Sequence, residues 1–484
     1  MVPEAMTGDP SFLVFLPSFN RPRFAEALLR DLVEQSVGRR VRIHFRDDCS
    51  DCDYSAVRDF ARGHGDTVVY ERHAQNRARD GLWKTYNEIF AVAREEQPDF
   101  LIVLQDHSRI VPGFFDELAR LWNAIPDANK TIVNLPRDAK ALYRWWSPVF
   151  HSVVEHDGVD FVTSGWVDGS WFAGRRLWET MDLDLSPPGA PPPPKDPYRG
   201  HPTLYQLAQK VRSGGGSIYT PTKILAPPAS PRIESPSRAV HVFIPTYNRP
   251  ENLLILLRQI EEESEGYRVA VDVFDDASTA DYSLVEQWIA SVKTPVTMHR
   301  HEENRGKRGF WKTFNDIFRI MIASPEDSMV ILQDDAEICT RFFDAILEYW
   351  SAITDKRKIA LNIQRRILCD GHIWQAKEGT LMSLDGRKVW FSGWFDGMWF
   401  GTRDTLEALS YCVHAMDPRR WDGDPLLSSG VGQQLTDRLN TAGYNIYMPF
   451  ESLVRMIPGK SFMNPDVRAT QEIREVNFRG RNDG

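Results

Sequence analysis

The chain has 484 residues, of which 42% are hydrophobic, 26% charged and 11% aromatic, a balance typical of soluble globular proteins rather than disordered ones. A formal charge of -9 gives no general attraction to a polyanion, so nucleic acid is only a second-choice partner. The N-terminal sequence lacks a signal pattern, no apolar run approaches the ~18 residues of a transmembrane segment, and the five cysteines offer only a lone CxxC. We therefore expect a cytoplasmic protein without a transmembrane segment.

The first half of the chain has the pattern of alternating strands and helices. Apolar runs typical of buried strands are FLVFLP, VRIHFRD, TVVYER and FLIVLQDH, and helical spacing follows the first three at 24–33, 54–60 and 81–92. This alternation predicts a mostly parallel sheet with right-handed crossovers, which bring the carboxyl ends of the strands to one edge. Because several of these strands end in acids, that edge is a candidate binding site.

The second half repeats this order after a constant shift of 228 positions. The shift relates FLPSFNRP to FIPTYNRP, QNRARDGLWKTYNEIF to ENRGKRGFWKTFNDIF, IVLQDHSRI to VILQDDAEI, and SGWVDGSWF to SGWFDGMWF. Repeats of this length are whole domains rather than solenoid units. We expect an α/β fold of two tandem Rossmann-like domains, arising from an internal duplication, at 1–225 and 239–450.

Two further segments complete the predicted organisation. The Pro- and Ser-rich sequence APPASPRIESPSR at 226–238 predicts an interdomain linker. Residues 451–484 show little apolar periodicity and several arginines, and we expect them to form a tail that wraps the second domain or lies free.

The order of motifs in the second half, PTYNRP, FDDAS, ENRGKRGFWKTFN, LQDDAEI and SGWFDG, resembles that of nucleotide-sugar glycosyltransferases with the GT-A fold, and family 2 most of all. The resemblance implies that the turn after the first strand and the acids after the second strand hold the donor nucleoside. In this sequence those residues are Thr246, Asn248, Arg249, Asp275 and Asp276. Asn and Asp are also favoured in turns, which is an alternative explanation, above all for Asn248.

The resemblance also implies a divalent metal, Mn or Mg, bound where LQDDAEI matches the family's Asp-x-Asp motif. Gln333 replaces the first acid of that motif, Asp334 lies on the donor side, and Asp335 is the expected metal ligand. A divalent cation suits a diphosphate leaving group because hard oxygen ligands bridge its phosphates. A solvated turn is the alternative.

In the first half the corresponding candidate metal ligands are Asp106 and His107. Imidazole is a poorer ligand for Mg than for Mn, so a metal site in the first domain is in doubt. His107 could equally be a surface histidine.

A basic segment precedes and enters the helix of ENRGKRGFWKTFN. Its donor-binding candidates are Arg305, Lys307, Arg308 and Lys312, which suit phosphate oxygens. Arg77, Arg79 and Lys84 recur at the positions equivalent to three of them, which favours binding over the alternative of a solvated face.

An inverting transfer, which the resemblance suggests, needs a general base to accept the proton of the acceptor hydroxyl. The position that carries this acid in the family holds Val431 and Gly432 here, so the role must fall elsewhere. We favour Asp396 as the catalytic residue, with Asp422 and Asp424 as the other candidates. An Asp before Gly is also common in simple turns.

These features together predict a metal-dependent glycosyltransferase that moves a sugar from a nucleotide-sugar donor to the hydroxyl of a glycan or other acceptor. The second domain is the surer catalytic unit. Two alternatives stay open because fold does not fix substrate: a phage-type enzyme that glycosylates a DNA base, and a non-catalytic tandem protein that binds carbohydrate.

Overall fold

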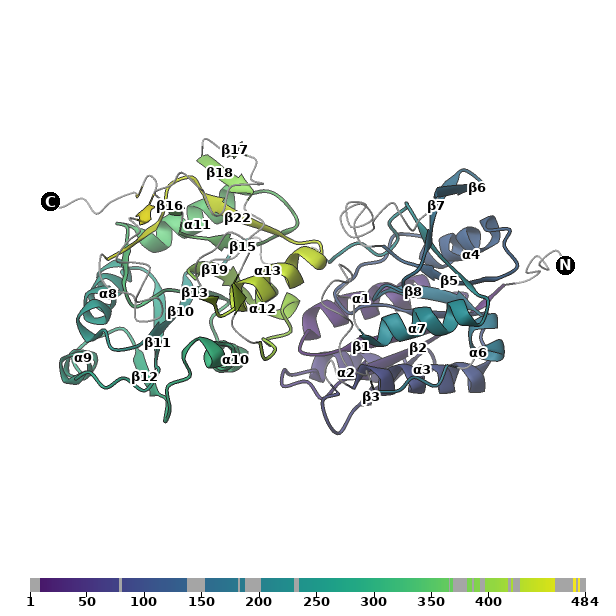
Figure 1. Ribbon diagram of the computed structural model, residues 1–484, viewed down its shortest axis with the longest axis horizontal. Helices are drawn as coiled ribbons and strands as arrows, with labels where there is room; N and C mark the ends of the chain where they lie inside the picture. Colours follow the sequence, from purple (N-terminus) through teal and green to yellow (C-terminus); the bar gives the residue numbers. More distant parts are fainter. Residues whose placement is uncertain are drawn as a thin grey trace. The chain divides into compact units, whose positions relative to one another are not determined.

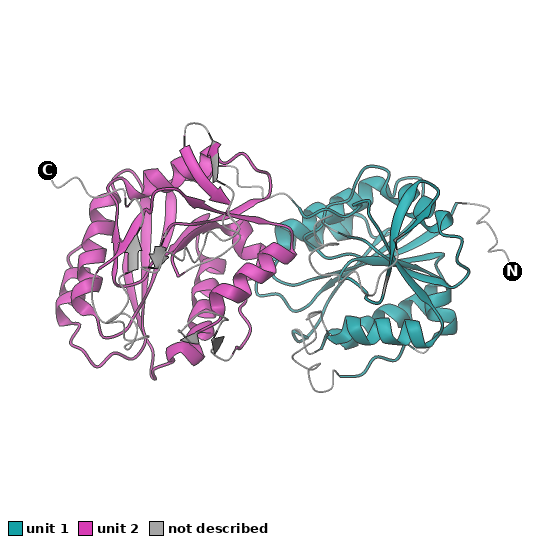
Figure 2. Ribbon diagram, turned by 45° about the horizontal axis from the view of Figure 1, so that its top comes forward, with its two compact units in different colours: residues 1–229 teal, residues 230–484 magenta. Residues whose placement is uncertain are grey.

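The computed structural model describes residues 9–77, 81–136, 153–181, 183–187, 202–229, 235–364, 366–368, 381–384, 387–391, 397–416, 419–420, 427–457, 473–475 and 478. The chain forms two compact units, unit 1 (Met1–Ala229) and unit 2 (Ser230–Gly484), shown in separate colours in Figure 2. The division falls within 226–238, and the predicted bounds of domains, linker and tail remain predictions.

Unit 1 begins with a strictly alternating series of strands and helices and then adds further strands (Figure 1). In chain order its elements are β1 (Ser11–Ser18), α1 (Pro22–Gln35), β2 (Arg40–Asp47), α2 (Ser55–Gly63), β3 (Val68–Arg72), α3 (Leu82–Glu96), β4 (Phe100–Val103), α4 (Phe114–Ala124), β5 (Lys130–Asn134), β6 (Val153–His156), β7 (Val159–Ser164), β8 (Trp171–Gly174), α6 (Arg176–Thr180), α7 (Pro202–Ser213) and β9 (Ser217–Pro221).

Unit 2 repeats the series and adds short strands near its end. In chain order its elements are β10 (Ala239–Thr246), α8 (Pro250–Glu263), β11 (Arg268–Asp275), α9 (Ser283–Ile289), β12 (Val296–Arg300), α10 (Gly306–Ala323), β13 (Ser328–Ile331), β14 (Ala336–Ile338), α11 (Phe342–Ala352), β15 (Lys358–Asn362), β16 (Arg366–Leu368), β17 (Leu381–Leu384), β18 (Arg387–Phe391), β19 (Trp399–Thr402), α12 (Arg403–Ala408), β20 (Arg419–Arg420), β21 (Leu427–Ser428), α13 (Val431–Thr441), β22 (Asn445–Pro449), β23 (Val454–Met456) and β24 (Ile473–Glu475).

The main sheets of the two units have corresponding strand orders. Unit 1 has the order β3-β2-β1-β4-β8-β5-β9-β7-β6, and unit 2 has β12-β11-β10-β13-β19-β15-β22-β18-β17. The first four strands of each sheet are parallel, whereas β8 and β19 run antiparallel to their neighbours. The predicted α/β class, with one large sheet in each of two tandem units, is therefore confirmed.

Local sequence explains how the first βα unit forms in each half. β1 and β10 are apolar and almost entirely buried, as expected for strands covered on both faces. Pro22 and Pro250 begin α1 and α8, where a missing backbone N–H has no cost. Asn20 and Asn248, which precede these helices, both adopt the left-handed conformation at φ 53°, and this turns the chain sharply at the carboxyl end of the strand.

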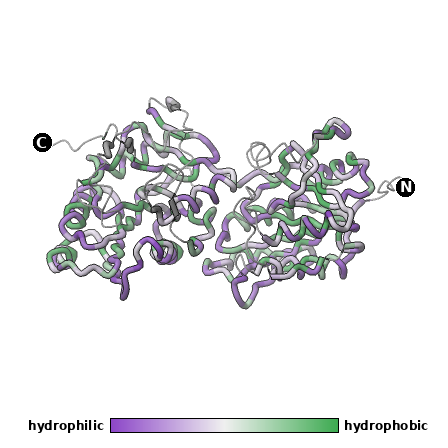
Figure 3. The backbone as a smooth tube through the Cα atoms, in the orientation of Figure 1, coloured by the Kyte–Doolittle hydropathy of each residue, from purple (hydrophilic) through white to green (hydrophobic). Residues whose placement is uncertain are grey.

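Each unit buries apolar side chains against its own sheet. In unit 2, α8, α9 and α11 pack on one face of the sheet, and α10, α12 and α13 lie on the other side (Figure 1). Hydrophobic stretches run through the interior of each unit, while hydrophilic stretches follow the outer loops (Figure 3). These layers leave the carboxyl ends of β10, β11 and β13 together at one edge.

The described parts of the predicted linker and tail pack against the units. In unit 1 the backbone N–H of Ala229 donates to the carbonyl of His107 at 2.8 Å. In unit 2 β23 pairs with β14, and the N–H of Ile457 donates to the carbonyl of Asp335 at 2.7 Å. Both contacts hold the backbone next to the acids that end the central strand.

Candidate active site

The acids predicted to bind metal lie beside the first strand of unit 2. β13 pairs in parallel with β10, and the N–H of Leu332 donates to the carbonyl of Phe243 at 3.0 Å. This register places Asp334 and Asp335 next to the turn that follows Thr246. Both carboxylates are buried, with 7% and 2% of their residue surface exposed.

Asp334 is held by groups from that turn. Its Oδ2 accepts hydrogen bonds from the Thr246 hydroxyl at 2.9 Å and from the N–H of Tyr247 at 3.2 Å. The Nη1 of Arg249 donates to Asp334 Oδ1 at 3.2 Å and also forms an ion pair with Asp335. One guanidinium therefore serves two adjacent carboxylates.

The two adjacent carboxylates repel one another in a buried place. Burial, followed by the charge of Asp335, raises the pKa of Asp334 from 3.8 to about 6, even though Arg249 and the Thr246 hydroxyl act in the opposite direction. An additional cation near the two carboxylates would relieve this repulsion.

The equivalent cluster in unit 1 is electrically balanced. The Ser18 hydroxyl donates to Asp106 Oδ2 at 2.8 Å, and Arg21 Nη1 donates to Asp106 Oδ1 at 2.8 Å. His107 Nδ1 lies 2.9 Å from Arg21 Nη1 and 3.1 Å from Asp106 Oδ1. Although burial opposes it, Arg21 and His107 hold the pKa of the Asp106 carboxyl well below its usual range. A single carboxylate paired with Arg21 has less need of a metal.

The other predicted nucleoside-binding residues of unit 2 shape the loops around this edge. Asn248 Oδ1 accepts the N–H groups of Thr279 and Ala280 at 2.7 and 3.0 Å, which is the turn role considered for it. Buried Asp275 accepts the N–H of Ser278 at 2.9 Å and pairs with Arg300 at 2.8 Å.

Asp276 caps the helix that carries the basic segment. Its carboxylate accepts the N–H groups of Arg305 and Gly306 at 2.8 Å each, so it satisfies donors at the start of α10. The acid and the basic segment are thereby joined in one structural unit, a link that sequence spacing did not reveal.

The basic residues of α10 are not equivalent. Arg305 is engaged with Asp316 at 2.6 Å along the same helix. Lys307 and Arg308 lie in its first turn, and the Lys312 ammonium lies 5.9 Å from the Trp311 ring. Lys307, Arg308 and Lys312 thus belong to the first two turns of α10, where cations would suit an anionic ligand.

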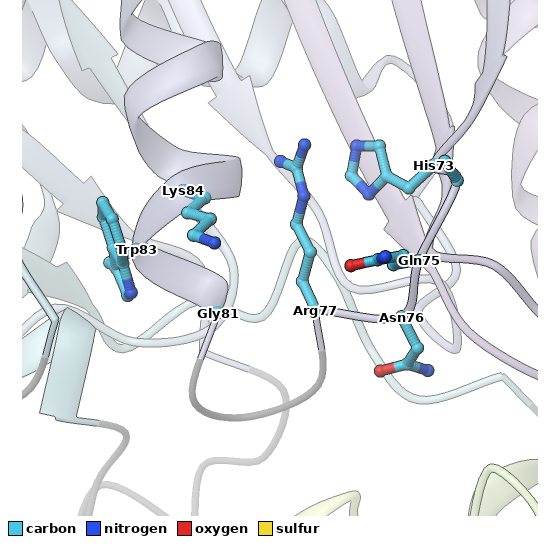
Figure 4. A pocket seen from close by; sticks show the side chains of 8 residues that line it. His73, Gln75, Asn76, Arg77, Gly81, Trp83 and Lys84 are labelled. Carbon is cyan, nitrogen blue, oxygen red and sulfur yellow. The ribbon is translucent and has the colours of Figure 1, made fainter.

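In unit 1 the matching segment borders a pocket of ≈ 510 Å³ between the end of β3 and the start of α3. Figure 4 shows Arg77 in this pocket between His73 on one side and Trp83 and Lys84 on the other. Arg77 and Lys84 were predicted from the repeat; Arg79 lies outside the described residues. His73 and Trp83 were missed, although His301 and Trp311 recur at the equivalent positions.

The three candidates for the general base, Asp396, Asp422 and Asp424, lie outside the described residues. The unit 1 counterpart of the first is Asp168, whose N–H donates to Asn134 Oδ1 at 2.9 Å. Asp168 Oδ1 accepts the N–H of Gly169 at 2.7 Å.

Two further observations concern metal ligands and membrane-spanning helices. Across the described part of the chain, no group of three or more His, Cys, Asp or Glu side chains is arranged to hold a metal ion. Within that same part, no helix combines the length and the apolarity needed to cross a membrane.

Comparison with known proteins found partial matches to glycosyltransferases. No family model matches the chain. A dolichol-phosphate mannosyltransferase of Pyrococcus furiosus is 32% identical over 112 residues, a match that spans 22% of this chain and 30% of that protein. The match therefore covers less than a third of the relative's length.

Solved structures that match part of the chain include a mannosyltransferase of Pyrobaculum calidifontis in complex with GDP-Man and Mn2+. It is 17% identical, covers 47% of this chain and 59% of that chain, and has a TM-score of 0.32. S. aureus TarS 1-349 in complex with UDP-GlcNAc is 13% identical over 47% of this chain and 60% of that chain, with a TM-score of 0.31. These proteins are what parts of the chain resemble, and each match spans less than half of it.

Proposed function

We propose that unit 2 transfers a sugar from a nucleotide-sugar donor to an acceptor hydroxyl. The observation that carries this proposal is the pair of adjacent buried carboxylates, Asp334 and Asp335, at the carboxyl end of β13, both in contact with the Arg249 guanidinium. A site of this kind attracts a cation, and a cation in turn attracts a diphosphate. The sequence match to a mannosyltransferase supports the same chemistry.

The residues present fit a divalent metal, Mn or Mg. Asp334 and Asp335 would hold the metal. Burial and the charge of Asp335 raise the pKa of Asp334, and a bound cation would offset both effects. Two carboxylates suffice because such ions keep several water or phosphate ligands. When bound, the ion supplies charge stabilisation to a diphosphate leaving group.

The chain's own residues then position the donor. Arg249 fixes both carboxylates, and the Thr246 hydroxyl orients Asp334. Lys307, Arg308 and Lys312 offer positive charge for the phosphates, with Arg305 as a structural partner of Asp316. We infer that Asn248, Asp275 and Asp276 support the nucleoside side of the site by fixing its loops.

For unit 1 we infer a binding role without a metal. The balanced charge of Asp106, Arg21 and His107 removes the reason to recruit a divalent ion. Arg77 is paired with Glu88 at 2.6 Å, as Arg305 is with Asp316, so we assign the contact with an anionic ligand in this pocket to the Lys84 ammonium. Turnover by unit 1 is therefore not expected.

The acceptor step needs a base, and we propose Asp396 for it, ahead of Asp422 and Asp424, in an inverting transfer. The test is transfer by Asp396→Asn compared with Asp422→Asn and Asp424→Asn. A loss of ~100-fold, the usual worth of a general base, is expected for Asp396→Asn alone.

The proposed function is tested by incubating the full chain with a panel of nucleotide sugars, with Mn or with a chelator. We expect Mn-dependent release of nucleoside diphosphate by the wild type and by His107→Asn, and loss of it in Asp335→Asn. Binding of glycans without release would instead favour the carbohydrate-binding alternative, and transfer only to DNA would favour the DNA-base alternative.

A further inference from the structure

Two amide side chains at the carboxyl end of β15 are fully buried in unit 2. Asn362 and Gln364 each expose 0% of their surface. Among the described residues, the Asn362 Nδ2 atom and both amide atoms of Gln364 have no hydrogen-bond partner. Buried amides in folded proteins are nearly always hydrogen-bonded, so these three atoms call for an explanation.

The same place in unit 1 is built differently. Asn134, the counterpart of Asn362, donates from Nδ2 to the Trp166 carbonyl at 3.0 Å and to the Thr220 hydroxyl at 2.9 Å. The counterpart of Thr220 in unit 2 is Met448, which offers no hydroxyl, and the counterpart of Gln364 is Pro136, which has no polar side chain. Compared with Asn134, Asn362 therefore lacks one hydrogen-bond partner, and unit 2 has one additional buried amide, that of Gln364.

The amides lie on the edge of the sheet that carries the acids. Trp399 of β19 pairs with Ile331 of β13 on one side and with Asn362 of β15 on the other. Adjacent strands are about 4.8 Å apart, so β15 lies about 10 Å from β13. Gln364 and Asp334 both follow these strands in the carboxyl direction.

We propose that Asn362 and Gln364 bind hydroxyl groups of the sugar carried by the donor. This inference rests on the proposed function and names the residues that would read the sugar. A primary amide donates and accepts at once, as a sugar hydroxyl does, so a bound sugar would satisfy all three atoms. The separation of two strand spacings, about 10 Å, is one that a sugar attached to a diphosphate at Asp335 would bridge, on the side away from the β10 turn.

Unit 1 supplies a further reason for this assignment. Its satisfied Asn134 and its Pro136 leave no equivalent amide for a sugar. The same unit has the balanced Asp106 cluster. Unit 2 thus has both the carboxylate pair and the two buried amides, and unit 1 has neither arrangement. This is expected if the carboxylates and the amides bind the same ligand.

The test compares wild type with Gln364→Leu, a substitution of similar size without polar atoms. Without ligand, the melting temperature of Gln364→Leu should equal or exceed that of the wild type, because the amide gains nothing in the empty protein. Gln364→Met serves as a second variant of flexible shape. A lower melting temperature in both variants would mean that Gln364 is already satisfied, and would overturn the proposal.

The second measurement is calorimetric binding in the presence of Mn, with UDP against UDP-GlcNAc and GDP against GDP-mannose. For Gln364→Leu we expect unchanged affinity for the nucleoside diphosphates and about tenfold weaker affinity for the nucleotide sugar that the wild type binds best. Equal affinity for that sugar in variant and wild type would overturn the role of Gln364 alone. A wild type that binds none of the four probes would overturn the proposed function itself.

Discussion

At the scale of single residues, the main difference between the units is one side chain beside a buried aspartate. Asp335 faces Arg249 and Asp334 in unit 2, whereas His107 faces Arg21 and Asp106 in unit 1. The pKa of Asp334 is raised to about 6 by burial and by Asp335, and that of Asp106 is lowered by Arg21 and His107 against the effect of burial. The two units should therefore respond to pH in opposite directions.

A raised pKa in the folded state means that the contribution of Asp334 to stability is complete below pH about 4 and is lost as pH rises through about 6. We expect the unfolding free energy of the wild type, relative to Asp334→Asn, to fall by about 2 kcal/mol between pH 4 and pH 7. Denaturation of the full chain at several pH values without metal measures this difference.

Asp106→Asn is the matched control in unit 1. Its lowered pKa gives stability that is present above the ordinary value of 3.8 and is lost only as pH falls through the folded value. The wild type minus Asp106→Asn difference should thus be flat between pH 5 and pH 7. If the difference in unfolding free energy depends on pH in the same way for both variants, the two carboxylates do not have oppositely shifted pKa values, and the prediction is wrong.

At the scale of elements, the start of α10 depends on an acid from another strand. Asp276 follows β11 and accepts the N–H groups of Arg305 and Gly306. Asp276→Ala should lower the unfolding free energy by about 1 kcal/mol, the usual value of a helix cap, and should weaken binding of a nucleoside diphosphate by displacing Lys307 and Arg308. Denaturation and calorimetry of the same preparation check both effects.

Asp276→Asn provides the comparison because its amide oxygen can still accept one of these hydrogen bonds. It should keep most of the stability that Asp276→Ala loses. If Asp276→Ala is as stable as the wild type, then the start of α10 is fixed by other contacts.

A second element-scale prediction concerns β23. The N–H of Ile457, just beyond that strand, donates to the carbonyl of Asp335. Ile457→Pro removes this donor, and we expect a loss of about 1–3 kcal/mol in stability together with weaker Mn binding. Denaturation midpoints and Mn titration measure the two effects.

Arg455→Ala is the control for this change because Arg455 belongs to β23 and pairs through a half-exposed side chain with Glu337. Its effect on stability should stay within about 0.5 kcal/mol, with Mn binding unchanged. If Ile457→Pro and Arg455→Ala lose Mn affinity equally, Mn binding depends on the packing of β23 in general and not on the hydrogen bond to the Asp335 carbonyl.

At the scale of the whole molecule, the sequence predicted the regular elements of each half well because buried strands and amphipathic helices have strong periodic patterns. FLVFLP lies in β1 and FLIVLQDH contains β4, and the acids after the strands do meet at one edge. The constant shift then transferred each assignment to the other half.

Contacts between distant residues could not be predicted in the same way. Arg249 reaches Asp334 and Asp335 across 85 and 86 positions, and the pairing depends on the register between β10 and β13. The capping role of Asp276 and the unsatisfied amides of Asn362 and Gln364 likewise depend on packing, which leaves no periodic signal in the sequence.

The central claim is that the two adjacent buried carboxylates of Asp334 and Asp335 hold a metal-dependent donor site in unit 2, whereas the single carboxylate of Asp106 in unit 1 does not. The most direct measurement is the number of Mn ions bound per chain in the presence of a nucleoside diphosphate. We expect one ion for the wild type, none for Asp335→His, and two for His107→Asp, because the last substitution gives unit 1 the carboxylate pair of unit 2. Wild-type levels of Mn binding in Asp335→His would contradict the account.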